Sequence, residues 1–242
     1  MQTLRGYAAT LLLHKPRQLR VAAEAYVGWT PSALGENMIS EFVDSLGKCL
    51  CFNNVENQYA SSFKYYEITK NNLTQYLKSM YLLKPKIILV GEAPGYNGCR
   101  WSGVPFTSEN NITAEYFNDL LFGFKNGFKV RDINHVQKEA SATIVWNVLK
   151  GFNKLPLMWN AFPFHPYRDD NLESNRTPIK VELDYGKQKL EEIIKIFSIE
   201  KIIAVGSIAY ETLQKMNIEC NKIRHPANGG KREFIEGIKR EM

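Results

Sequence analysis

Three segments of the chain combine turn-forming residues with side chains that can do chemistry. Gly91-Glu92-Ala93-Pro94-Gly95 holds a carboxylate, the segment 160–166 brings the Asn160 amide and His165, and the segment 224–231 brings His225 beside two glycines. A carboxylate and a histidine can exchange protons with a substrate, and an amide can recognise a hydrogen-bonding edge. Each segment follows a run that is expected to form a strand, so we expect all three at strand ends, where sites form in parallel sheets.

Two familiar kinds of site are disfavoured by the spacing in these segments. The glycine-rich stretch 91–98 lacks both the Gly-Lys-Ser/Thr end of a P-loop and the G-x-G-x-x-G spacing of a dinucleotide site. His165, Asp169, Asp170 and His225 are possible metal ligands, but no pair has a spacing as tight as H-E-x-x-H. The sequence therefore predicts no metal site, and we expect no thermal stabilisation by mononucleotides.

The elements that must position these residues alternate between buried strands and helices. Wholly or largely apolar runs predict short strands at 87–90, 157–161 and 202–205, and a fourth, short strand is expected at 221–224. Helical spacing predicts helices around 116–124, 144–149 and 190–197, another from Ser207, and a last one around 234–238. The alternation predicts an α/β fold in three layers, α/β/α, whose central parallel sheet has about four strands.

Residues 1–84 are predicted to form a mainly helical extension of this core. Thr30-Pro31-Ser32 is typical of a helix start, and Asn71 is the expected cap of a second helix. The segment 51–66, rich in Asn, Ser and Tyr, is predicted to be a loop. With no internal repeat and no linker, residues 1–242 are expected to form one domain, with the α/β core at 85–242.

Taken together, the motifs resemble those of the uracil-DNA glycosylase superfamily over about residues 85–238. The resemblance rests on Gly-Glu-Ala-Pro-Gly at 91–95, on Pro105-Phe106, on Asn160 at a strand end and on His225-Pro226-Ala227. It implies a monofunctional DNA glycosylase, an enzyme that hydrolyses the N-glycosidic bond of a pyrimidine flipped out of DNA.

The resemblance assigns two catalytic residues, Glu92 and His225. Glu92 would stabilise the cation that develops on the sugar and orient the attacking water. His225 would donate a hydrogen bond to the base oxygen on which negative charge accumulates, and His165 is the second candidate for this role. Other superfamily members carry an acid one position later, where this chain has Ala93, so it stays open whether Glu92 activates water directly.

The resemblance also implies how the base is held. Phe106 would supply the stacking face, and the Asn160 amide would pair with the edge of the pyrimidine. Strict uracil enzymes place a bulky aromatic at the fifth motif position, where it blocks a substituent on C5; here Gly95 leaves space, which the neighbouring Tyr96 can refill. The expected base-binding residues are Gly91, Ala93, Gly95, Tyr96, Phe106 and Asn160.

Two substrate classes stay open, because an Asn amide can rotate to suit uracil or cytosine. One is uracil in deaminated DNA. The other is a C5-modified pyrimidine, including the glucosylated hydroxymethylcytosine of phage DNA that antiviral defence glycosylases of this superfamily attack. A catalytically weak DNA-binding module is a further alternative, although both Glu92 and His225 are present.

The segment 224–232 is the expected DNA-binding loop. Small residues and two glycines lie between basic ones, a composition that suits insertion at the vacated base while the cations hold phosphates. The expected contact residues are Arg224, Pro226, Ala227, Asn228, Gly229, Lys231 and Arg232.

Composition and charge bound the remaining properties. The net charge is +6, and residues 1–30 and 221–242 each carry +3, which favours a polyanion surface if the two ends meet. No apolar run approaches the length of a membrane span, and the stretch 7–13 is not typical of a secretory signal.

Many superfamily members with the same Gly-Glu-Ala-Pro-Gly motif bind an iron–sulfur cluster through four cysteines. In this chain Cys49 and Cys51 lie too close together in the sequence to match the spacing of those ligands, and Cys99 and Cys220 do not complete the four. No iron–sulfur cluster or other cofactor is therefore expected. We expect a cytoplasmic monomer, nucleoid-associated if the protein is bacterial.

Overall fold

The computed structural model describes residues 33–49, 52–114 and 121–242. The basic segment 1–30, the helix-start residues Thr30-Pro31-Ser32 and most of the helix expected at 116–124 lie outside these ranges. Phe124, at the end of that expected helix, lies in the short 3-10 helix η2, Phe124–Asn126. Within the described ranges, no helix combines the length and apolar character needed to cross a bilayer.

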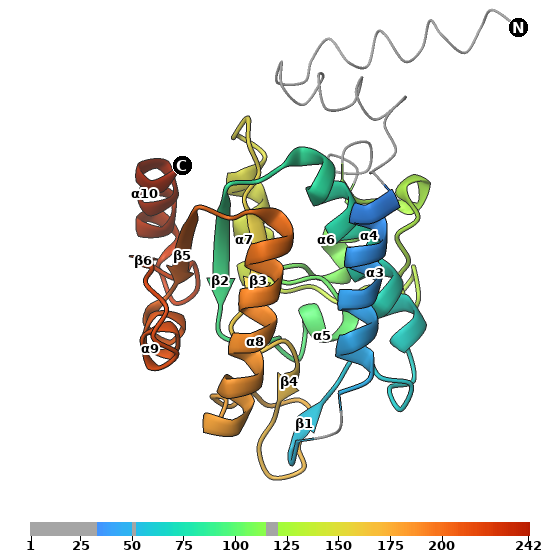
Figure 1. Cartoon of the computed structure of the whole chain (residues 1–242). Helices are drawn as coiled ribbons and strands as arrows, with labels where there is room; N and C mark the ends of the chain where they lie inside the picture. The colour runs from blue at the N-terminus through green and yellow to red at the C-terminus, as the bar shows by residue number, and fades with distance from the viewer. Residues whose placement is uncertain (1–32, 50–51, 115–120) are drawn as a thin grey trace, which may run out of the picture.

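A four-stranded parallel sheet forms the centre of the fold (Figure 1). Its strands are β2 (Ile87–Gly91), β3 (Leu157–Asn160), β5 (Lys201–Val205) and β6 (Asn221–Ile223), in the order β3-β2-β5-β6. The register pairs Gly91 with Asn160, so β2 and β3 end side by side. The sheet confirms the α/β architecture that the apolar runs predict.

Helices flank this sheet (Figure 1). Helix α8 (Lys180–Phe197) packs on β3, α9 (Ser207–Lys215) packs on β5 and β6, and α10 (Lys231–Glu241) packs on β6. The smaller helices α5 (Cys99–Ser102), α6 (Glu109–Thr113) and α7 (Ala140–Leu149) lie between β2 and β3 in the chain. The residues Ile88, Leu89 and Val90 of β2 are fully buried, because helices and neighbouring strands enclose a short apolar strand of this kind.

The N-terminal part of the described chain is helical, with one correction to its expected boundaries. Helix α3 (Ala33–Gly47) packs against α4 (Tyr66–Leu83) and against α8. The centroids of the Phe42 and Trp159 rings lie 5.4 Å apart. Helix α4 begins at Tyr66, so the expected start at Asn71 was wrong; Asn71 lies inside the helix.

One strand of a second, two-stranded sheet lies within the segment 51–66, which was expected to be a loop. Strand β1 (Val55–Glu56) pairs antiparallel with β4 (His165–Pro166). The pair joins the helical N-terminal part to the segment that follows β3, and so helps to hold that segment at the edge of the main sheet.

Candidate active site

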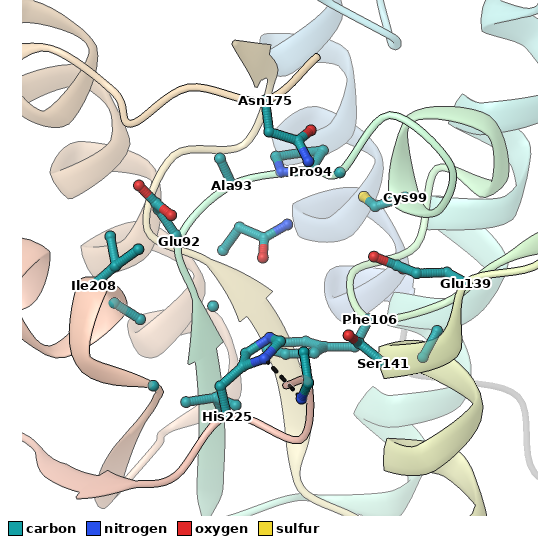
Figure 2. A pocket seen from close by; sticks show the side chains of 18 of the residues that line it. Glu92, Ala93, Pro94, Cys99, Phe106, Glu139, Ser141, Asn175, Ile208 and His225 are labelled. Carbon is teal, nitrogen blue, oxygen red and sulfur yellow. Dashed lines mark hydrogen bonds between the residues drawn. The ribbon is translucent and has the colours of Figure 1, made fainter. Parts of the chain in front are cut away.

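The loops that follow the parallel strands surround a cavity of about 540 Å³ at the carboxyl edge of the sheet (Figure 2). Ten of the residues expected from the sequence line it: Gly91, Glu92, Ala93, Gly95, Phe106, Asn160, Arg224, His225, Ala227 and Asn228. Five others do not line it: Tyr96, Pro226, Gly229, Lys231 and Arg232.

Gly91, Phe106 and Asn160 pack so closely that the first of them must be glycine. A Cβ atom on Gly91 would lie 2.7 Å from Asn160 Oδ1 and 2.8 Å from Phe106 Cζ. Such distances are too short for carbon contacts, so any larger residue would displace the amide or the ring. The missing side chain of Gly91 therefore sets the spacing between the aromatic face and the amide.

Phe106 is held in a strained backbone conformation. Its φ of 53° lies in the left-handed region, which a bulky side chain rarely adopts. The turn around it is fixed by hydrogen bonds: Ser102 Oγ donates to the Thr107 carbonyl, and Trp146 Nε1 donates to Thr107 Oγ1 at 3.1 Å. Strain of this kind persists where the surroundings impose it, and it is concentrated at functional sites.

Asn160 ends β3 with its side chain largely buried, at 5% exposure, and facing the cavity. Across the described residues, no hydrogen bond engages its side-chain amide. A buried amide normally has partners. The arrangement therefore leaves both the donor and the acceptor of Asn160 available to a ligand in the cavity.

His225 follows β6 and is fixed as a neutral hydrogen-bond donor. The backbone N–H of Ala227 donates to His225 Nδ1 at 3.1 Å (Figure 2). Since a backbone N–H can only donate, Nδ1 carries no proton and Nε2 carries it. Burial lowers the pKa of His225, and the nearby positive charge of Arg224 lowers it further. The site therefore presents an Nε2–H group without an imidazolium charge.

Glu92 follows β2 and carries a half-buried carboxyl group. Its Oε1 atom is buried and has no hydrogen-bond partner among the described residues. Burial raises the pKa of this carboxyl, while a hydrogen bond from the Thr177 side chain and the charge of Lys215 lower it. Glu92 lines the cavity, and a carboxylate there can bind a water molecule or stabilise a nearby positive charge.

The expected DNA-binding loop lies at the mouth of this cavity. Arg224, Asn228 and Gly229 are exposed, whereas Pro226 is buried. The first turn of α10 exposes Lys231 and Arg232. Arg232 donates to Glu236 at 3.0 Å, so part of its charge is already neutralised within the helix.

His165 has a structural environment rather than a place on the cavity. Its side chain is fully buried, with Nδ1 2.9 Å from the Pro94 carbonyl oxygen and Nε2 3.0 Å from that of Leu172. It therefore ties the 91–98 loop to the segment after β4. Asp169 and Asp170 are exposed, and no cluster of metal-ligating side chains occurs in the described part of the chain.

Three further lining residues have no role in the expected site. Asn175 Oδ1 accepts a hydrogen bond from the backbone N–H of Tyr96 at 3.2 Å, and Arg176 is paired with the buried Glu182 through both terminal nitrogens. Glu139, the residue before α7, also lines the cavity. Asn175 and Arg176 belong to the longer segment that follows β3, whereas Glu139 follows no expected strand and is brought to the cavity by long-range packing.

Comparisons with known proteins bear on the fold and the family of this chain. A solved structure described as "The crystal structure of WT Pedobacter heparinus SMUG2" is similar in fold, with a TM-score of 0.61 and 15% sequence identity over 86% of this chain and 96% of that chain. None of the curated proteins matches. A family-level comparison matches residues 79–237 to the Uracil DNA glycosylase superfamily. The chain therefore belongs to the uracil DNA glycosylase superfamily, and it is a DNA glycosylase.

Proposed function

We propose that this protein hydrolyses the N-glycosidic bond of a pyrimidine flipped out of DNA, and that the base is uracil or a C5-modified pyrimidine. The proposal includes a monofunctional reaction, with water as the nucleophile and no cofactor, carried out by a monomer whose residues 1–242 form a single domain. Such an enzyme must hold the flipped base, stabilise charge on both sides of the breaking bond and grip the DNA backbone.

The reaction develops opposite charges on the sugar and the base. As the bond between C1′ and the base nitrogen breaks, its electron pair leaves with the base and C1′ becomes cationic. The Glu92 carboxylate stabilises that cation, and a water molecule adds to C1′ and transfers a proton to the carboxylate. The place of Glu92 on the cavity that Asn160 and His225 also line supports this role.

His225 stabilises the departing base. Its Nε2–H donates to the base oxygen where negative charge accumulates, and the neutral ring needs no prior protonation. The hydrogen bond from Ala227 supports this role, because it fixes the proton on Nε2 before the substrate arrives.

Phe106 and Asn160 recognise the base. The Phe106 ring stacks on the pyrimidine, and the Asn160 amide pairs with its edge. The single observation that carries the whole proposal is the packing of these two side chains over Gly91 in the cavity that Glu92 and His225 also line. Packing of the core alone would not require an amide without hydrogen-bond partners, Asn160, beside a phenylalanine in a strained backbone conformation, Phe106.

The rim of the cavity holds the DNA backbone. Arg224 and Lys231 contribute positive charge, and the loop 224–230 occupies the space that the flipped base leaves in the duplex. The first turn of α9, which begins at Ser207 on the cavity, offers unpaired backbone N–H groups to a phosphate.

The proposal is tested by base release followed by alkaline strand cleavage. Matched oligonucleotides contain a central uracil or thymine, in single- and double-stranded form, and are compared with phage DNA with and without glucosylated hydroxymethylcytosine. Release of uracil supports a repair-type enzyme, and release confined to the glucosylated DNA supports antiviral defence. Absence of release from every substrate contradicts the proposal and favours a DNA-binding module.

A further inference from the structure

The cavity contains a carboxyl group that the proposed mechanism does not use. Glu139 reaches into it from the segment that leads to α7, beside Cys99 and Ser141 in the view of Figure 2. A Cβ atom on Gly98 would lie 2.0 Å from Glu139 Oε2, and one on Gly95 would lie 3.1 Å from Oε1. The carboxyl therefore occupies the volume that side chains at these two loop positions would fill.

The backbone on both sides of Glu139 is fixed. Gln137 donates its N–H to Glu109 Oε2 at 3.0 Å and accepts a hydrogen bond from the Asn110 N–H at 3.0 Å. Glu109 is fully buried and also binds the Arg131 guanidinium through both oxygens. After Glu139, the N–H of Thr143 donates to the Glu139 carbonyl at 3.0 Å. The side chain is thus presented to the cavity from a rigid support.

The Glu139 carboxyl itself has no protein partner in the described part of the chain. No hydrogen bond or ion pair there reaches either of its oxygens. Burial raises its pKa, which shows that the surroundings provide little compensation for a charge. Filling the space beside Gly95 and Gly98 would need only an apolar side chain, and an unpaired carboxyl costs more than an apolar one. Its presence is explained if a ligand supplies the missing hydrogen-bond donor.

We propose that Glu139 is a specificity-determining residue, whose carboxyl accepts a hydrogen bond from a hydroxyl group carried on C5 of the flipped pyrimidine. This inference rests on the proposed function, in which Gly95 faces C5. A hydroxyl group on the C5 substituent donates a hydrogen bond to the Glu139 carboxyl. A methyl group at the same position displaces water from the carboxyl and leaves it without a hydrogen-bond donor. Glu139 thereby favours hydroxymethyl-type substituents and rejects thymine.

The test compares two bases that differ by one hydroxyl group. Oligonucleotides carrying 5-hydroxymethyluracil, thymine or uracil at one site are treated with the wild type, Glu139→Ala, Glu139→Gln and the control Glu200→Ala. Glu200 is an exposed acid that pairs with Lys86 before β2, at the opposite edge of the sheet. Thermal unfolding of each variant checks that the fold is retained.

We expect the wild type and Glu200→Ala to release 5-hydroxymethyluracil about 10- to 100-fold faster than thymine. Glu139→Ala should bring that ratio close to one, and Glu139→Gln should retain part of it through its amide oxygen. If uracil is released but the ratio is the same in the wild type and Glu139→Ala, or neither C5-substituted base is released, this inference alone is overturned. If the wild type releases none of these bases but does release the glucosylated base of phage DNA, the inference fails and the proposed function stands. If it releases neither these bases nor the glucosylated one, the proposed function fails as well.

Discussion

Burial favours the uncharged form of both proposed catalytic residues, Glu92 and His225. For His225 this form is the one that the reaction uses, because a neutral ring with its proton on Nε2 donates to the base oxygen. For Glu92 it is not, because the carboxylate is the form that stabilises a cation. The site therefore holds Glu92 as a poorly solvated anion, whose charge becomes more favourable as positive charge develops on the sugar.

Glu92→Gln should abolish most of the base release while leaving DNA affinity intact. The amide keeps the size of the side chain but can neither accept the proton of water nor offset the charge on the sugar, so we expect a loss of about 10²- to 10⁴-fold. Single-turnover base release and binding to the same oligonucleotide measure the two effects. The exposed Glu211→Gln serves as the control. Unchanged turnover in Glu92→Gln would place the catalytic acid elsewhere.

The pH profile of base release should show a loss of activity at acid pH. The pKa of Glu92 lies above its usual 4.5, so its carboxylate forms only as the pH rises through that raised value. The pKa of His225 lies below its usual 6.5, so the ring stays neutral until the pH has fallen through the lowered value. Both changes act in the same direction, and the rate should rise from acid towards neutral pH. A single-turnover rate that falls over this interval would contradict the assignment.

Asn160→Asp should weaken uracil release and alter base preference. The substitution replaces the amide donor by an acceptor while the spacing over Gly91 is kept, so a base edge that needs a donor loses one hydrogen bond. We expect uracil release to fall by about 10- to 100-fold relative to cytosine-type bases. Competition between bases in one reaction measures the preference, with Asn217→Asp as an exposed control. A fixed preference would show that Asn160 does not recognise the base edge.

At the scale of elements, the sequence predicts β2, β3 and β5 well because each is a largely apolar run that ends where a glycine or polar residue begins. It places the start of α4 too late because two polar residues lie on the buried face of that helix. Thr69 Oγ1 donates to the Gln58 carbonyl, and Asn72 Nδ2 donates to the carbonyls of Ser102 and Lys129. Apolar periodicity cannot reveal a face that is buried by hydrogen bonds.

The same reasoning separates the parts of the site that the sequence predicts from those that it does not. Glu92, Asn160 and His225 follow strands of a parallel sheet, whose carboxyl ends meet at one edge. Glu139 follows no expected strand and comes to the cavity through contacts between distant segments, beside Gly95 and Gly98. The pairing of β1 with β4 was not predicted either, because strands of two residues are too short to show a periodic pattern in the sequence.

Gly186→Ala tests how α8 positions the end of β3. A Cβ atom at this position would lie 2.1 Å from the Ala161 carbonyl oxygen, and the Ala161 N–H is bound to the Gly91 carbonyl at 2.8 Å. Alanine gains about 1 kcal/mol of helix propensity, but a clash with backbone cannot be relieved by rotating a side chain. We expect a net loss of about 1–3 kcal/mol in the free energy of unfolding, together with slower base release through Asn160.

Gly151→Ala is the matched control for this prediction. Its Cβ atom would lie 3.4 Å from the Val148 carbonyl oxygen, which is an ordinary contact, so its stability should change little. Denaturant unfolding of both variants measures the difference. Equal stabilities for the two variants would mean that α8 shifts away from β3 without cost.

At the scale of the whole molecule, positive charge near the cavity should make DNA affinity depend on salt. The net charge of +6 includes +3 in residues 221–242, where Arg224 lines the cavity and Lys231 begins α10 directly after the loop 224–230. Neither of them forms an ion pair or side-chain hydrogen bond with the described residues, whereas Arg232 is bound to Glu236. Arg224 and Lys231 are therefore free to displace counterions from DNA phosphates.

Arg224→Ala and Lys231→Ala should each reduce the slope of log affinity against log salt concentration by about 1. Affinity should fall for every DNA sequence alike, because phosphate contacts carry no base information. Lys86→Ala removes the same charge at the opposite edge of the sheet, where Lys86 pairs with Glu200, and should leave the slope unchanged. Fluorescence anisotropy over a range of salt concentrations measures all three. If Lys86→Ala lowers the slope as much as the other two, the affinity follows net charge alone, and DNA has no preferred face on this molecule.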